Sequence, residues 1–118
     1  MKYDNIFSRL INASKYSLSG LYYAVKNEQP FRYECCVLGI IIILLMFMSW
    51  PFTWKIFLIF SWIFLMCLEL INSAVEKAFD LIDKNFRPEI KAGKDMLSSA
   101  VFLAVCFNIF IWGISFLF

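Results

Sequence analysis

The sequence lacks histidine altogether, and its cysteines are few and irregularly spaced. The four cysteines, Cys35, Cys36, Cys67 and Cys106, lie in apolar segments, and the one close pair is adjacent rather than C-x-x-C. Zinc sites and disulfide frameworks are built from histidine or cysteine at characteristic spacings. The sequence supports neither, and we expect buried free thiols that act as small apolar residues.

Glycine is also scarce, with only four residues, at positions 20, 39, 93 and 113. No G-x-x-x-x-G-K-[ST] loop exists, because Gly93–Lys94 lacks the preceding glycine-rich turn. The H-R-D and D-F-G motifs of protein kinases are absent as well. The common nucleotide-binding motifs of soluble proteins are therefore excluded.

Basic residues form no dense cluster, and the formal net charge is only +2, so nucleic-acid binding has no support. Charges occur at intervals through the first 34 residues, so we expect no secretory signal there. A chain of 118 residues is expected to form a single domain over 1–118.

What the sequence has in abundance is apolar residues, at 62%, against 17% charged residues. This composition indicates an integral membrane protein. Charge is absent from Cys35 to Trp54 and from Met96 to Phe118, and Ile56 to Val75 contains only Glu69. A helix needs about 20 apolar residues to cross the bilayer. The predicted spanning helices cover about 30–49, 52–84 (with a cytoplasmic extension) and 90–117.

The N-terminal segment is amphipathic and predicts a helix lying in the membrane interface over about 5–27. Its apolar residues recur at helical spacing: Phe7, Leu10, Ile11, Leu18, Leu21, Tyr22 and Val25. Pro30 is expected to end this helix before the first spanning one. The predicted fold class is an all-α membrane protein.

Lysine and arginine predict the orientation of the chain. They are concentrated before residue 34 and between residues 77 and 94, whereas the first connection holds only Lys55 and the C-terminal segment has none. The positive-inside rule then places the N-terminus and the second connection in the cytoplasm, and the C-terminus outside.

Glu69 heads a polar stripe in the second spanning segment. Asn72 and Glu76 follow at i+3 and i+7, so the three side chains fall within roughly 60° of one another on a helix. An ionisable group at membrane depth costs roughly 2.5 kcal/mol or more, and such groups are usually functional.

Further polar residues are expected at the same cytoplasmic level: Glu28, Arg32, Glu34, Lys94, Asp95 and Ser98. The set suits phosphoryl transfer, because carboxylates bind Mg²⁺, lysine neutralises phosphate, and a desolvated Glu69 favours accepting a proton from an alcohol. Other interpretations stay open: hydrogen bonds that only join helices, a solvated charged face, a proton-coupled transporter that uses Glu69, or an inert assembly subunit.

Three motifs carry a resemblance to a known family. E-L-I-N-S-A-V-E-K-A-F-D at 69–80, K-D-M-L-S-S-A at 94–100 and F-R-Y-E at 31–34 resemble the prokaryotic diacylglycerol kinase family over essentially the whole chain. The resemblance implies a homotrimer of three-helix subunits in the bacterial cytoplasmic (inner) membrane, with active sites shared between subunits. It also implies transfer of phosphate from Mg-ATP to diacylglycerol, giving phosphatidic acid.

The resemblance also implies roles for individual residues. Glu69 resembles the general base, Glu28 and Glu76 the Mg²⁺ ligands, and Asn72, Lys94 and Asp95 other catalytic residues. The implied nucleotide contacts are Tyr16, Ser17, Glu28, Asn72, Glu76, Lys94 and Asp95. The implied substrate contacts are Arg9, Glu69 and Ser98. Gly20 falls where the N-terminal helix helps to form the nucleotide or lipid cleft of the family. Arg32 and Glu34 lie where the first spanning helix begins.

The chain departs from the family pattern at two places. Gly93 stands where alanine is common, which predicts a looser start to the last helix, because glycine weakens a helix by about 0.8–1 kcal/mol relative to alanine. Residues 83–91 are unlike the family, so no adenine or ribose contact is carried over to them. F-R-x-E at 31–34 favours diacylglycerol over undecaprenol, which stays the alternative lipid.

Overall fold

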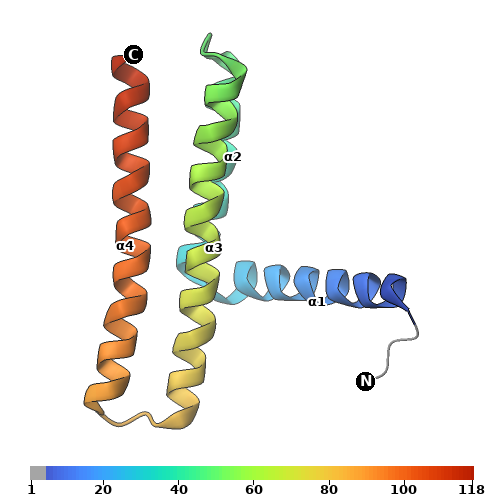
Figure 1. The fold of residues 1–118 in the computed structure, drawn as a ribbon, viewed down its shortest axis with the longest axis vertical. Helices are drawn as coiled ribbons and strands as arrows, with labels where there is room; N and C mark the ends of the chain where they lie inside the picture. Colours follow the sequence, from blue (N-terminus) through green and yellow to red (C-terminus); the bar gives the residue numbers. More distant parts are fainter. Residues whose placement is uncertain (1–4) are drawn as a thin grey trace.

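The computed structural model describes residues 5–118, and within this range the chain forms four helices and no strand. They are α1 (Ile6–Asn27), α2 (Gln29–Phe47), α3 (Phe52–Ile82) and α4 (Pro88–Leu117). Figure 1 shows α2, α3 and α4 running along one another, with α1 projecting crosswise from the group. The predicted all-α fold is confirmed.

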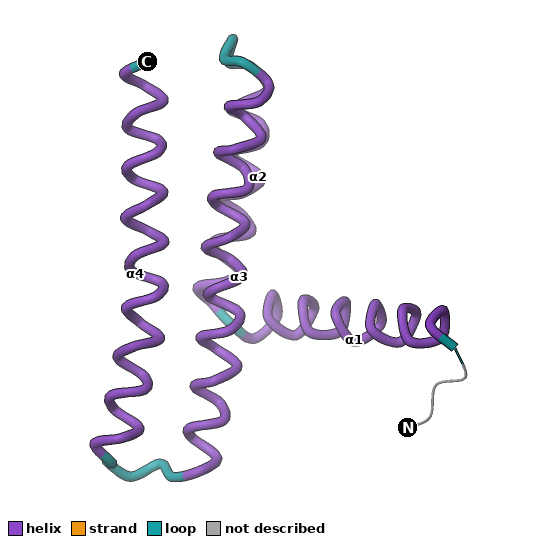
Figure 2. Tube along the Cα trace, in the orientation of Figure 1, coloured by secondary structure: helices purple, strands orange, loops and turns teal. Residues whose placement is uncertain are grey.

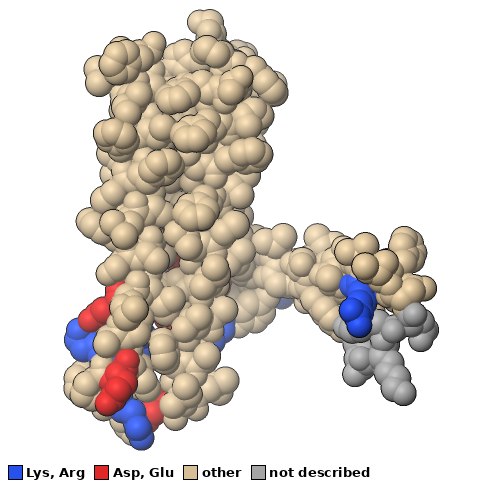
Figure 3. Space-filling model, viewed as in Figure 1, with Lys and Arg blue, Asp and Glu red and all other residues tan. Residues whose placement is uncertain are grey.

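Length and composition make α2, α3 and α4 able to cross a membrane, with 19, 31 and 30 residues respectively. The prediction of three helices able to span a membrane is therefore confirmed. The space-filling view shows charged side chains gathered where α3 and α4 are joined, whereas the other end of the bundle is uncharged on this face (Figure 3). α1 leaves apolar side chains such as Leu10 and Leu18 exposed, as an interfacial helix would.

The break between α1 and α2 is a single residue. Asn5 caps the start of α1, where its side-chain oxygen accepts a hydrogen bond from the Ser8 N–H at 2.8 Å. At the end of α1, Glu28 has an extended backbone. Pro30 lies in the first turn of α2, where a backbone N–H would have no acceptor within the helix, so the lack of an N–H in proline costs no hydrogen bond there. Pro30 thus lies at the start of α2, and α1 ends before it, at Asn27. Figure 2 shows the short teal connection.

The opposite end of the bundle, which we call the uncharged end because Lys55 is the one charged side chain among its described residues, holds the two most fully buried large side chains. Leu58 on α3 is 0% exposed and Leu45 on α2 is 2% exposed, and both pack with Ile41 and with Ile111 of α4. The Trp54 indole N–H donates to the Ser115 hydroxyl at 2.6 Å, joining the start of α3 to the end of α4. These contacts fix the register of the two long helices.

A second buried cluster ties α1 to the bundle. Ala24 of α1, Phe31 of α2 and Met66 of α3 are all buried together. The Trp62 indole N–H donates to the Glu34 backbone carbonyl at 2.9 Å, which adds a polar link between α3 and α2. The cluster positions the α1–α2 junction, and with it Glu28, beside the middle of α3.

All four cysteines are free thiols, as predicted. Their predicted burial was wrong for three of them: Cys36, Cys67 and Cys106 are exposed, and Cys35 is partly buried. In a membrane protein the outer surface of a helix bundle is itself apolar, so a thiol there avoids water without being packed inside a single chain.

Candidate active site

A polar pocket of about 270 Å³ lies between α3 and α4. Its lining residues are Glu69, Asn72, Glu76, Ser98, Val101 and Phe102. The sequence predicted the polar stripe on one helix, and the structure brings Ser98 to it from the neighbouring helix. Spacings of three, four and seven residues on α3 keep the stripe on the side that faces α4.

Hydrogen bonding inside the pocket is incomplete. Glu69 is 8% exposed, and no residue in the described range 5–118 donates a hydrogen bond to its carboxylate or forms an ion pair with it. The Asn72 amide N–H donates to Glu76 at a long 3.4 Å, and the Asn72 carbonyl oxygen is buried with no partner. Buried polar atoms are usually satisfied, so the unpartnered Asn72 oxygen indicates a site built for a donor or a cation.

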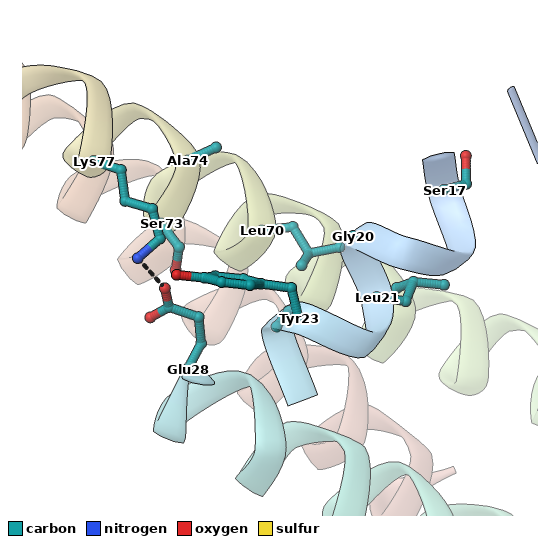
Figure 4. Close-up of a pocket in the computed structure, with 10 residues that line it drawn as sticks. Ser17, Gly20, Leu21, Tyr23, Glu28, Leu70, Ser73, Ala74 and Lys77 are labelled. Carbon is teal, nitrogen blue, oxygen red and sulfur yellow. Dashed lines mark ion pairs between the residues drawn. The ribbon is translucent and has the colours of Figure 1, made fainter. Parts of the chain in front are cut away.

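A larger cavity of about 520 Å³ lies on another side of α3, between that helix and α1. Figure 4 shows its polar end, where the Glu28 carboxylate pairs with the Lys77 ammonium at 2.7 Å. Lys77 also lies over the Tyr23 ring, 5.4 Å from its centroid. Ser17 and Gly20, both expected near a ligand cleft, line this cavity.

Sequence reasoning missed Lys77, Tyr23 and Ser73 as lining residues of this cavity. A signal for two of them was present, because Leu70, Ser73, Ala74 and Lys77 are spaced i, i+3, i+4 and i+7 and so share a helix face. Tyr23 had no comparable signal, since its place depends on how α1 crosses α3.

A third hollow, of about 350 Å³, surrounds the connection between α3 and α4. It is lined by Lys84, Asn85, Phe86, Arg87, Ile90, Lys91, Lys94 and Asp95. Lys94 pairs with Asp80 at 2.9 Å, and Asp95 pairs with Lys91 at 2.6 Å. Four basic residues line this hollow, and three of them, Arg87, Lys91 and Lys94, are paired with carboxylates, so part of the positive charge is already neutralised.

The turn that closes this hollow is held by Asp83. Its carboxylate accepts the Asn85 backbone N–H at 2.9 Å and the Arg87 side-chain N–H at 2.6 Å. These two hydrogen bonds lower the pKa of Asp83 below its ordinary value, and the bond from the Asn85 backbone has the larger effect. The charged Asp83 therefore fixes the path of the basic connection.

Within one chain the predicted site residues thus fall into separate places. Glu69, Asn72, Glu76 and Ser98 share the polar pocket, Ser17 and Glu28 line the α1–α3 cavity, and Lys94 and Asp95 line the basic hollow. Arg9 and Tyr16 lie on exposed parts of α1. On α2, Arg32 is exposed and Glu34 is partly buried, with one carboxylate oxygen lacking a partner.

Comparison with known proteins decides the family. The model of the prokaryotic diacylglycerol kinase family matches residues 15–116. The chain belongs to the prokaryotic diacylglycerol kinase family. The predicted resemblance and the prediction of a kinase are therefore confirmed.

Individual family members are similar along most of their length. The diacylglycerol kinase of Haemophilus influenzae is 42% identical over 106 residues, which is 90% of each chain. That of Helicobacter pylori strain J99 is 37% identical over 107 residues, covering 91% of this chain and 84% of its own. That of Escherichia coli K12 is 32% identical over 106 residues, covering 90% and 87%.

Proposed function

We propose that this protein transfers the γ-phosphate of ATP to the free hydroxyl of diacylglycerol, giving phosphatidic acid. Glu69 acts as general base in this reaction. As the lipid oxygen forms its bond to the γ-phosphorus, the hydroxyl proton passes to the Glu69 carboxylate. The bond from that phosphorus to the β,γ-bridging oxygen breaks, and ADP leaves with the bond's electrons.

The observation that carries the proposal is the unpartnered carboxylate of Glu69 in the polar pocket. A charge buried at membrane depth is expensive unless it is paired, and Glu69 has no partner in the described range 5–118. A carboxylate with no donor or counter-charge keeps its oxygens free to accept the hydroxyl proton, as a base for a lipid alcohol must.

The oxygens beside Glu69 fit a magnesium ion chemically. Mg²⁺ binds through one or two carboxylates together with phosphate oxygens, and Glu76 adjoins the unpartnered carbonyl oxygen of Asn72. Glu76 and Glu28 are the residues that would hold the ion, with Asn72 as a neighbouring oxygen donor. Bound there with ATP, Mg²⁺ would neutralise charge on the phosphates.

Nucleotide binding is assigned to residues around α3. Lys94 contributes positive charge to the phosphates from the basic hollow, and Asp95 fixes the start of α4 through Lys91. Ser17 and Tyr16 of α1 contact the nucleotide from the side of the α1–α3 cavity. Arg9 and Ser98 contact the lipid headgroup.

The separation of these residues within one chain favours a homotrimer with shared active sites. Glu28 and Glu76 line different hollows, and Lys94 lines a third. Exposed apolar side chains on the spanning helices, such as Ile43 and Phe64, leave surface for other copies or for lipid. The trimer lies in the bacterial inner membrane, with its charged end in the cytoplasm.

Purified protein in detergent micelles containing diacylglycerol or undecaprenol tests the proposal. With Mg²⁺ and ATP labelled at the γ-phosphate, label should enter the diacylglycerol, and omission of either Mg²⁺ or ATP should abolish the transfer. Preferential labelling of undecaprenol would overturn the substrate assignment. Absence of labelling, together with ATP-independent, proton-driven transport in vesicles, would support the transporter instead.

A further inference from the structure

Gly93 and Phe79 form an unusually close contact between α4 and α3. A Cβ atom built on Gly93 would lie 2.5 Å from Cζ and 3.0 Å from Cε2 of the Phe79 ring. Real Cβ atoms essentially never approach another heavy atom within 3.0 Å, so any larger residue here forces the ring or the helix to move. The tip of the Phe79 ring therefore occupies the space that a side chain at 93 would take.

The residues next in sequence form a second contact between the same helices. Asp80 follows Phe79, Lys94 follows Gly93, and their side chains pair at 2.9 Å. An exposed ion pair alone is a weak restraint. The adjacent contact is steric: a side chain at 93 would have to displace the tip of the Phe79 ring or move the start of α4 away from α3.

We propose that Phe79 and Gly93 are positioning residues for Lys94. The ring of Phe79 packs against the backbone of Gly93, and this contact sets the distance from Lys94 to Asn72 and Glu76 on α3. The inference rests on the proposed function, because it takes Lys94 as a nucleotide contact. It adds two residues to which no role was assigned.

This contact predicts the opposite of the sequence-based expectation for Gly93. Glycine was expected to loosen the start of the last helix, because alanine has the higher helix propensity. In the structure the helix begins before Gly93, at Pro88, and the missing Cβ allows closer packing. Helix propensity and packing thus predict opposite effects for Gly93→Ala.

Four variants separate these effects: Gly93→Ala, Phe79→Leu, the double variant, and Gly113→Ala as control. Gly113 lies on the same helix, and a Cβ there would meet nothing within 4 Å. Leucine keeps an apolar side chain at 79 but lacks the Cζ and Cε atoms that the new Cβ would strike. Each variant is measured for KM and kcat with Mg-ATP, and for the rise in Tm caused by a non-hydrolysable ATP analogue.

Gly93→Ala should raise KM for Mg-ATP by about tenfold or more, with a smaller change in kcat, because displacement of a positioned group by about 1 Å can cost a factor of about 100. Its analogue-induced rise in Tm should shrink. The double variant should recover most of both losses, and Gly113→Ala should match the wild type.

An unchanged KM in Gly93→Ala overturns the inference, and so does a double variant no better than Gly93→Ala. If Gly93→Ala does not fold, recovery of fold and KM in the double variant supports the contact, and non-recovery overturns it. Wild-type protein without ATP-dependent lipid phosphorylation would instead refute the proposed function, and this inference with it. The two failures are therefore distinguishable.

Discussion

The two ends of the α3–α4 pair are built in opposite ways. At the uncharged end, Trp50 packs edge-on against Phe116 with ring centroids 5.2 Å apart, and Trp54 bonds to Ser115 across the helices. At the charged end the same two helices enclose a polar pocket in which Glu69 is buried without a partner. Both ends hold a pocket, of about 370 Å³ beside Trp54 and Ser115 and of about 270 Å³ beside Glu69, but the first is lined mostly by aromatic and apolar side chains and the second has two carboxylates and an amide.

This difference indicates that the residues that stabilise the fold and the residues proposed for catalysis lie at different ends of the α3–α4 pair. Aromatic and aliphatic packing at the uncharged end holds α3 and α4 together. The charged end is then able to keep unpaired oxygens, which cost free energy in the absence of a ligand. Mutations at the two ends should accordingly change different quantities: activity at the charged end, and stability at the uncharged end.

The largest expected effect is on catalysis at the charged end. Glu69→Gln keeps the size of the side chain but removes its ability to accept a proton, so kcat should fall by about 10²–10⁴-fold. Folding should be retained, because an uncompensated buried charge is removed. The rate of label transfer from ATP to diacylglycerol measures the effect.

The matched control is Glu89→Gln, the same change at an exposed carboxylate in the first turn of α4. Its kcat should stay within about twofold of the wild type, because surface changes away from a site have small effects. Full activity in Glu69→Gln would remove the general-base assignment.

The next effect is on stability at the uncharged end. Leu45 is 2% exposed and adjacent Leu44 is 52% exposed, so the two positions offer the same substitution in opposite environments. Leu45→Ala should destabilise the protein by about 2 kcal/mol or more through the cavity it leaves, and Leu44→Ala by much less. Reversible unfolding in mixed micelles provides the measurement. Equal losses would indicate that another surface buries Leu44.

A smaller effect is expected for the hydrogen bond between Trp54 and Ser115. Trp54→Phe, Ser115→Ala and the double variant form a thermodynamic cycle. Hydrogen bonds between membrane helices average about 0.6 kcal/mol and reach about 1.7 kcal/mol, so the coupling energy should fall in that range. The lipid kinase activity should not change, and strictly additive losses would argue against a stabilising bond.

The smallest effect concerns pH and the turn at Asp83. Because its pKa is lower in the folded protein than in the unfolded chain, its contribution to stability is present above the unfolded value near 4. That contribution is lost as pH falls through the folded value. Asp83→Asn should therefore lower Tm slightly at pH 7 and have less effect near pH 3. A larger effect in acid would contradict this account.

The sequence by itself determined the fold class and the polar stripe. Long uncharged segments predict spanning helices because an unpaired charge or backbone group in lipid is expensive. Residues 69, 72 and 76 share a face because helical periodicity is a local property. The family followed from the same residues, since the motif at 69–80 lies on a single helix.

Only the tertiary structure decided how the helices meet. The spacing of Lys94, Asp95 and Ser98 allowed a common face, but Ser98 lines the pocket of Glu69 while Lys94 and Asp95 line the basic hollow. Lys77 of α3 pairs with Glu28 at the α1–α2 junction, and Gly93 of α4 packs against Phe79 of α3. Such contacts depend on crossing geometry and on the volumes of facing side chains, which no single helix specifies.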